Sequence, residues 1–271
     1  MARSFERTKS SVNDSMLEQL RDAIHHHFAP RRHTALLVAI IAAFAVRPLI
    51  GDVGVGPILF STALVLLLLV ALYNINVDEL VGERGILLAQ SRRRRVVGWV
   101  LALAAIGERV SIFFAQSRAL LVAGSICWLM YLAFVTFSEL RSVLKQKEIT
   151  GETISMAISV YLLLGVTWGF LYMLIFQLQP GAFASLSVPH SGGASDLQPI
   201  FPILGYYSLG TLSTIGAGDI TPLSLQARYA TAAEAITGQF YLAILVARLV
   251  GLQMSQSVRR SAEDETRDSN T

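Results

Sequence analysis

Residues 200–219 read IFPILGYYSLGTLSTIGAGD, and this stretch decides how the chain folds. Its first fourteen residues, 200–213, are mostly apolar, but a helix of that length cannot cross a hydrocarbon core of about 30 Å. They predict a short helix that enters the membrane, followed by a non-helical return. Non-helical backbone is tolerated at membrane depth only where protein buries it or where it lines a wet cavity.

The return segment carries glycine at alternate positions. It reads Thr214-Ile215-Gly216-Ala217-Gly218-Asp219. Glycine adopts dihedral angles that other residues avoid, so a strand of this kind is able to turn successive carbonyls to one side. Stacked rings of carbonyl oxygens replace the hydration shell of an ion. The segment is therefore predicted to bind cations in a pore.

The rest of the chain has the composition of a membrane protein. Of its 271 residues, 53% are hydrophobic and only 15% are charged, whereas soluble domains carry about 25% charged residues. This balance argues against a soluble enzyme. Six segments have the length and apolar character of a membrane span: residues 34–50, 56–74, 96–115, 119–137, 154–178 and 224–254. The predicted fold is an all-α membrane protein with six transmembrane helices and a re-entrant segment between the fifth and sixth.

Basic residues are unevenly distributed between the predicted loops. Most of the 22 Lys and Arg residues precede the first span, follow the sixth, or connect spans two to three and four to five. Cytoplasmic loops hold such an excess, so both termini are expected in the cytoplasm of a multi-pass protein of the cell membrane. The run Arg92, Arg93, Arg94 and Arg95 abuts a span and lacks interleaved aromatics, which favours anionic lipid over nucleic acid as its partner.

These spans and loops divide the chain into five segments. Residues 1–33 form a cytoplasmic N-terminal segment, for which an interfacial helix and a partly ordered tail are equally good interpretations. Residues 34–138 form a four-helix scaffold and residues 139–152 a cytoplasmic linker. Residues 153–254 form a pore domain, and residues 255–271 are expected to be a disordered cytoplasmic tail because they are short and polar.

Residues 206–219, YYSLGTLSTIGAGD, resemble the pore helix and the Thr-Val-Gly-Tyr-Gly-Asp filter signature of the tetrameric potassium channel superfamily. The resemblance extends over residues 151–254. It implies a homotetramer, K⁺ as the permeant ion and no cofactor. The filter residues that it implies as the site of a monovalent cation are Thr214, Ile215, Gly216, Ala217 and Gly218.

The resemblance also implies roles for residues around the filter. Asp219 would mark the outer mouth, where four carboxylates concentrate cations. Glu234 is expected to be a hydrogen-bond or charge partner behind the filter, because intramembrane carboxylates are functional candidates. Gly238 and Gly251 are candidate hinges of the last helix, with close helix packing as the alternative. For Arg248, snorkelling is favoured over contact with a gate.

The sequence departs from the family signature at Ala217, where a tyrosine usually stands. The carbonyl remains, but the ring that supports the filter against the pore helix is missing. Either Tyr206 or Tyr207 supplies this support, or the filter is looser and separates K⁺ from Na⁺ less well. The predicted function is a cation channel that selects or prefers potassium, with a non-selective monovalent cation channel as the alternative.

The fourth predicted span, residues 119–137, contains no Lys or Arg. Each elementary charge moved across the membrane contributes only about 2.3 kcal/mol per 100 mV, so little voltage dependence is expected. The scaffold therefore resembles a voltage-sensor domain without gating charges. A secondary transporter is a remote alternative because the two halves are dissimilar. Enzymatic activity is not expected, since polar groups do not converge at one depth. Lipid, pH and constitutive leak all stay open as the gating mode.

Overall fold

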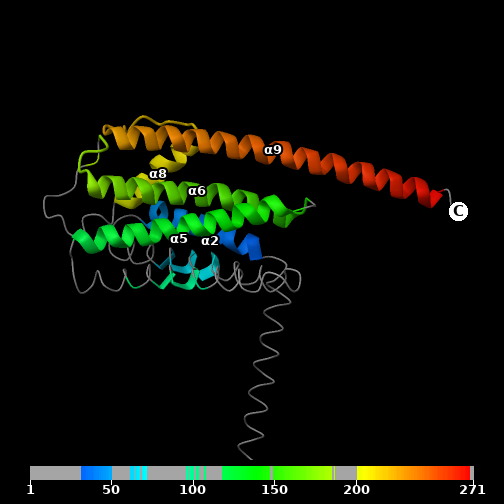
Figure 1. Ribbon diagram of the computed structural model, residues 1–271, viewed down its shortest axis with the longest axis horizontal. Helices are drawn as coiled ribbons and strands as arrows, with labels where there is room; N and C mark the ends of the chain where they lie inside the picture. Colours follow the sequence, from blue (N-terminus) through cyan, green and yellow to red (C-terminus); the bar gives the residue numbers. More distant parts are fainter. Residues whose placement is uncertain are drawn as a thin grey trace, which may run out of the picture.

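The computed structural model describes residues 32–50, 118–146, 149–184, 186 and 200–268, with parts of 62–71 and 96–107. Within these residues the long elements are helices: α2 (Arg32–Ile50), α5 (Arg118–Lys145), α6 (Gly151–Leu178), α8 (Ile200–Leu212) and α9 (Leu225–Asp268). Figure 1 shows α5, α6 and α9 running along the length of the molecule, with the short α8 between α6 and α9.

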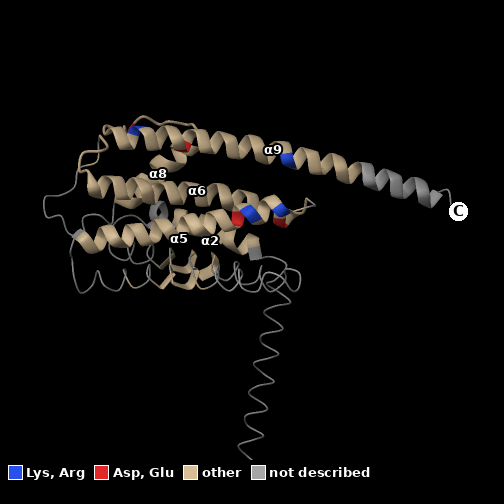
Figure 2. Cartoon of the chain, viewed as in Figure 1, with Lys and Arg blue, Asp and Glu red and all other residues tan. Residues whose placement is uncertain are grey.

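Three of the described helices are long and apolar enough to cross a membrane. They are Ala119–Lys145, Gly151–Leu178 and Leu225–Ser257, and they correspond to the fourth, fifth and sixth predicted spans. Lys, Arg, Asp and Glu gather where α5 ends and α6 begins and are sparse elsewhere along the coloured parts of the helices (Figure 2). The protein is therefore a helical membrane protein in the part of the chain that the structure describes.

Several predictions fall on residues that the structure does not describe. The N-terminal segment up to residue 31 and the run Arg92 to Arg95 lie outside the described residues. The same holds for most of the predicted spans 56–74 and 96–115. The predicted first span, 34–50, falls within helix α2.

Polar caps determine where α6 and α9 begin. Thr150 precedes α6, and its hydroxyl accepts the backbone N–H of Thr153 at 3.3 Å, while the Thr153 hydroxyl accepts the N–H of Thr150 at 3.3 Å. Ser224 precedes α9, and its hydroxyl accepts the N–H of Ala227 at 3.2 Å. A cap of this kind stabilises a helix by about 1 kcal/mol, so these residues place both starts.

Two helices continue beyond their predicted ends. α5 extends to Lys145, through much of the predicted linker 139–152. α9 extends to Asp268, whereas the sequence predicts a disordered tail over 255–271. The physical reason lies in the charge spacing, because opposite charges four residues apart stabilise a helix. The pairs with this spacing are Arg259 with Glu263, Arg260 with Asp264, and Glu263 with Arg267.

Helix α6 lies at the centre of the described fold. The Phe170 ring of α6 stacks on the Trp128 ring of α5 with centroids 5.6 Å apart. Its centroid lies 4.3 Å from that of the Phe201 ring on α8. Gly169 allows the close approach of α8, since a Cβ there would lie 3.4 Å from the Cα of Gly205. α6 thus connects the scaffold helices to the short helix that carries the candidate site.

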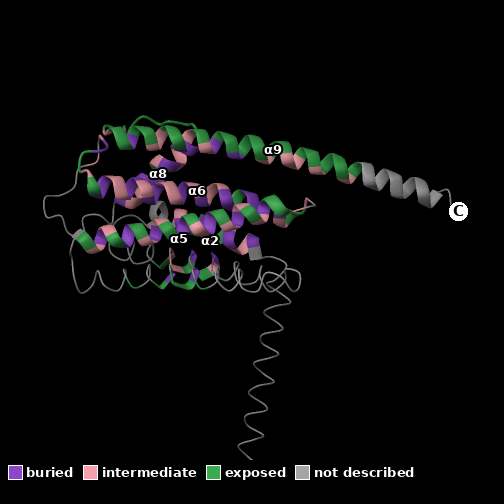
Figure 3. Ribbon diagram, in the orientation of Figure 1, coloured by how far each residue is buried: buried purple, intermediate pink, exposed green. Residues whose placement is uncertain are grey.

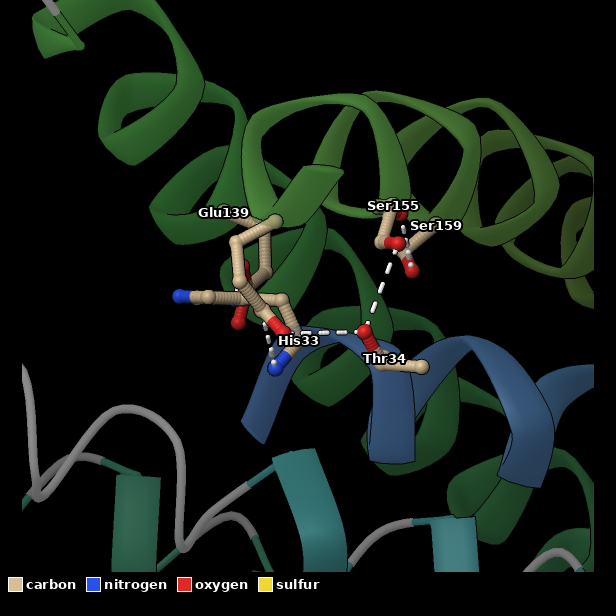
Figure 4. Close-up of polar contacts among 6 residues, drawn as sticks. His33, Thr34, Glu139, Ser155 and Ser159 are labelled. Atoms are coloured by element: carbon tan, nitrogen blue, oxygen red, sulfur yellow. Dashed lines mark hydrogen bonds and ion pairs between the residues drawn. The ribbon is translucent and has the colours of Figure 1, made fainter. Parts of the chain in front are cut away.

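A buried polar cluster joins α2, α5 and α6 at one end (Figure 4). The Glu152 carboxylate accepts the backbone N–H of His33 at 3.2 Å and the Thr34 hydroxyl at 2.9 Å. The Nδ1 atom of His33 lies 3.4 Å from Oε2 of Glu139, and both side chains are buried. The cluster therefore attaches the first described helix to the N-terminal end of α6.

Candidate functional site

The segment after α8, residues 214–218, is called the filter segment here. Its amides are held by the end of α8: the N–H groups of Ile215 and Gly216 both donate to the carbonyl of Gly210, at 2.8 and 3.2 Å. The N–H of Thr214 donates to the carbonyl of Thr211 at 2.9 Å. Because these donors point back at α8, the position of α8 sets the position of the filter segment.

The backbone of the filter segment alternates in hand. φ is 59° at Thr214, 56° at Gly216 and 80° at Gly218, and these positions alternate with residues of negative φ. Two residues of opposite hand in succession turn their carbonyls to the same side, which the glycine spacing predicts. Thr214 adds a third left-handed position, and a residue with a Cβ adopts it at a cost of about 1–2 kcal/mol. Such strain is typical of functional sites.

The whole filter segment is exposed in the single chain, together with Asp219. Ile215 is the extreme case, because 74% of this apolar side chain is accessible. The hydroxyl of Thr214 receives a long hydrogen bond, 3.4 Å, from Nε2 of Gln239 on α9. One side of the segment thus lies against its own chain and the other side is uncovered.

Tyr206 and Tyr207 differ in their surroundings. The Tyr207 hydroxyl lies 2.7 Å from the Thr231 hydroxyl on α9, and its ring packs edge-on against Tyr172 with centroids 5.1 Å apart. Tyr206 is half exposed and interacts with the carboxylate of Asp219. The sequence does not distinguish the two tyrosines, whereas in the structure it is Tyr207 whose hydroxyl contacts α9.

A cavity of about 200 Å³ lies behind the filter segment. Its lining includes Tyr206, Tyr207, Ala217, Asp219 and Thr231. The structure therefore places Ala217, where the family signature has a tyrosine, at the same cavity as Tyr206 and Tyr207, the two candidates to replace the missing ring. Neither phenol ring fills this space in the single chain.

Glu234 is fully buried where α6, α8 and α9 meet. Its Oε2 atom accepts a hydrogen bond from the Tyr172 hydroxyl on α6, and its Oε1 atom lies 2.5 Å from Oγ of Ser208 on α8. Sequence reasoning singles out Glu234 as a buried carboxylate but misses Ser208 and Tyr172. An intramembrane Ser or Tyr has no distinguishing pattern, so only the structure identifies these partners.

The two candidate hinge glycines have different environments. A Cβ at Gly238 would overlap the carbonyl oxygen of Leu212, so this position is a close contact between α9 and the end of α8. A Cβ at Gly251 would meet nothing within 4 Å. Beyond Gly238, the Arg248 guanidinium donates to the carbonyl of Gln146 at 2.7 Å. Arg248 therefore contacts the residue that follows α5, and snorkelling stays a prediction.

A β-bridge between Phe183 and Pro222 holds the exit of the filter segment. The N–H of Ala184 donates to Thr221 at 2.8 Å, and the N–H of Leu223 donates to Ala182 at 2.7 Å. The loop that follows α6 is thereby attached to the residues between the filter segment and α9. The sequence gives no indication of this bridge.

Comparison with known proteins gives one match. Residues 200–253, which comprise α8, the filter segment and most of the apolar part of α9, match a family model described as "Ion channel". No curated protein and no solved structure matches the chain. The match supports a cation channel and, with the apolar helices, a membrane location.

Proposed function

We propose that the chain is one subunit of a homotetrameric channel that conducts K⁺ in preference to Na⁺. The observation that carries this proposal is the alternation of positive φ at Thr214, Gly216 and Gly218, because such a backbone allows successive carbonyls to face one side. The match of residues 200–253 to an ion channel family is consistent with it.

The tetramer follows from the coordination that a bare cation needs. One filter segment offers one carbonyl per level, whereas about eight oxygens from two neighbouring four-fold rings replace the hydration shell. Four copies supply these rings. The exposure of Ile215 agrees with this arrangement, since a neighbouring subunit would cover its side chain.

The groups proposed to bind the ion are backbone carbonyls and one hydroxyl. They belong to Thr214, Ile215, Gly216, Ala217 and Gly218, with the Thr214 hydroxyl at the inner end. Asp219 follows the filter segment and would raise the local cation concentration at its outer mouth. Tyr207 and Glu234 lie behind the filter segment and would hold it from that side.

A non-selective monovalent cation channel is the second candidate. It is favoured by the cavity beside Ala217, since a filter segment with empty space behind it would adjust its width to Na⁺ as well as K⁺. In both cases little voltage dependence is expected, because residues 119–137 provide no basic residue for the field to move.

The experiment is a reversal-potential measurement on purified protein in liposomes, with K⁺ on one side and Na⁺ on the other. A potential close to the K⁺ equilibrium value supports potassium selectivity, and a potential near zero supports the non-selective channel. Recordings at strongly negative and positive potentials test voltage dependence in the same preparation. A steep activation curve would contradict the absence of a sensor.

A matched pair of glycine variants shows whether the current passes through the filter segment. Gly218→Ala places a Cβ at φ 80°, and Gly181→Ala places one at φ 92° in the loop after α6. Both changes strain the backbone in the same way. We expect conduction to be lost in the first variant and kept in the second. Equal conduction in both variants would contradict the proposed ion path.

A further inference from the structure

The contacts of Glu234 determine which atoms of the cluster carry protons. Oγ of Ser208 lies 2.7 Å from the carbonyl oxygen of Gly165 on α6 and 2.5 Å from Oε1 of Glu234. The Tyr172 hydroxyl donates to Oε2 of Glu234. Three helices thus meet in one chain of hydrogen bonds from Tyr172 through Glu234 and Ser208 to Gly165.

Ser208 has a single hydroxyl proton but lies close to two oxygen acceptors, so both contacts are hydrogen bonds only when Glu234 supplies a second proton. Because a backbone carbonyl only accepts, the Ser208 proton is directed at Gly165 in that arrangement. Ser208 then has only lone pairs to offer Glu234, and the proton between them belongs to the carboxyl group. With an ionised Glu234, Ser208 would donate to only one of its two acceptors, and the other pair of oxygens would face each other without a proton. A neutral Glu234 satisfies every group in the chain.

We propose that Glu234 works in its protonated form, as a positioning residue that fastens α8 between α6 and α9. The groups that face it are consistent with a neutral side chain. They are the phenols of Tyr161 and Tyr172 on α6 and of Tyr207 on α8, and none of them supplies a positive charge. Burial of an unpaired carboxylate would be strongly unfavourable.

By holding α8, Glu234 also affects the position of the filter segment. Ser208 is two residues before Gly210, whose carbonyl accepts the amides of Ile215 and Gly216. When Glu234 loses its proton at alkaline pH, Ser208 has to donate to the carboxylate and release Gly165. α8 then loses this hydrogen bond to α6 and keeps the one that the Tyr161 hydroxyl donates to the carbonyl of Leu212. The effect on conduction rests on the proposed channel function, but the protonation itself does not.

Infrared difference spectroscopy of the protein in liposomes tests the protonation directly. At neutral pH we expect the C=O band of a protonated carboxyl group, which disappears in Glu234→Gln. The matched control is Glu139→Gln, because Glu139 is the other buried glutamate of the described residues. This control should keep the band. A spectrum that is unchanged by Glu234→Gln would overturn the proposal, whether or not the protein conducts ions.

The positioning role is tested by the pH profile of K⁺ flux in the same liposomes. Glu234→Gln retains a donor for Ser208 and an acceptor for Tyr172, so it should conduct like the unmodified chain and lose the alkaline decline. Glu234→Ala offers neither and should lose most of its flux. A decline that persists unchanged in Glu234→Gln would overturn the role.

If Glu234→Gln does not fold, a further variant tests whether Glu234 carries the proton. Ser208→Ala removes the acceptor of the Glu234 proton, so the carboxyl C=O band should shift to higher frequency. A band that does not move contradicts the assigned proton. Absence of flux from the unmodified chain would instead contradict the channel function, and the infrared result would still stand.

Discussion

The two long helices α6 and α9 are both apolar enough to cross a membrane, but the rest of the chain buries them to very different extents. In the most apolar stretch of each helix, 50% of the residues of α6 are buried, compared with only 11% of the residues of α9 (Figure 3). α6 packs against α2, α5 and α8 as well as α9. It is therefore the core of the subunit, whereas α9 is attached along one side.

The attached side of α9 is a narrow stripe. Ala227, Glu234 and Tyr241 are buried and follow each other at intervals of seven residues, with Gly238 between the last two. This interval keeps them on one face of the helix. Outside the stripe α9 exposes many large apolar side chains, including Tyr229, Ile236, Phe240, Ile244, Val246 and Val250.

This difference in burial indicates that the two helices have different surroundings. The residues that bury half of α6 belong to the same chain, so this packing is present in a single subunit. A large exposed apolar face instead marks contact with lipid or with other protein. α9 is thus the helix whose outer face is open to lipid or, in the proposed tetramer, to further copies, and mutations on its two sides should have separable effects.

The largest effect is expected for Gly238→Val on the stripe. The new side chain would overlap the backbone of Leu212 at the end of α8, and a backbone group has little freedom to yield. Overpacking a dense site costs about 1–3 kcal/mol, and more where it displaces backbone. We expect no conducting protein, with misassembly visible in the mass of the detergent complex.

Gly251→Ala is the control for this prediction, because a Cβ at Gly251 has open space around it. Its mass and thermal stability should equal those of the unmodified chain. A slower opening rate in this variant would favour bending at Gly251. Normal assembly and conduction of Gly238→Val would show that α8 and α9 do not meet as described.

A pair of truncations separates the core of α6 from the outer face of α9. Leu163 is fully buried on α6, and Leu163→Ala should destabilise the subunit by about 2–5 kcal/mol, as large-to-small core changes do. Phe240 is 64% exposed on α9, so Phe240→Ala should leave the subunit fold intact and weaken the tetramer. Thermal unfolding measures the stability of the subunit, and native mass measurement reports the assembly. The same loss of fold in both variants would remove the distinction between the helices.

The next prediction concerns the cavity behind the filter segment. Ala217→Tyr should fill part of its 200 Å³ and raise the selectivity for K⁺ over Na⁺ by restoring support from the α8 side. If Tyr207 already limits the space, the ring overpacks the site and current is lost, at a cost of about 1–3 kcal/mol. Reversal potentials of the variant, alone and combined with Tyr207→Ala, distinguish the two cases. Unchanged selectivity and conductance would show that this side chain is no part of the support.

The smallest effect is expected at the far end of the stripe. Arg248→Gln removes a hydrogen bond to the carbonyl of Gln146, in a part of α9 that is only half buried. The loss should be about 1 kcal/mol or less, and it should appear as a small decrease in thermal stability with normal ion selectivity. A change in selectivity would indicate that this contact reaches the filter segment.

Much of the pore domain follows from local patterns. The sequence predicts a short helix over 200–213, and the structure has it over Ile200–Leu212. Alternate glycines indicate the unusual backbone of the filter segment, and two of its three positive φ angles lie at those glycines. Local signals of this kind act over a few residues, so they are readable without the fold.

Contacts between residues that are far apart in the sequence do not follow from local patterns. Glu234 meets Ser208 and Tyr172 across 26 and 62 positions of the sequence. His33 approaches Glu139, and Glu152 receives the His33 amide across 119 positions. Which polar groups meet depends on how three helices rotate about their axes, and hydrophobic periodicity in uniformly apolar helices does not specify that rotation.

The length of α9 has a mechanical consequence. Its 44 residues span about 66 Å at 1.5 Å per residue, twice the thickness of a hydrocarbon core. The portion beyond Gly251 alone is a rod of about 26 Å, and a bend of about 10° at that glycine would swing its tip by roughly 4–5 Å. If α9 bends at Gly251, the rod would act as a lever, and a small force applied near Asp268 would exert a larger one close to the bend.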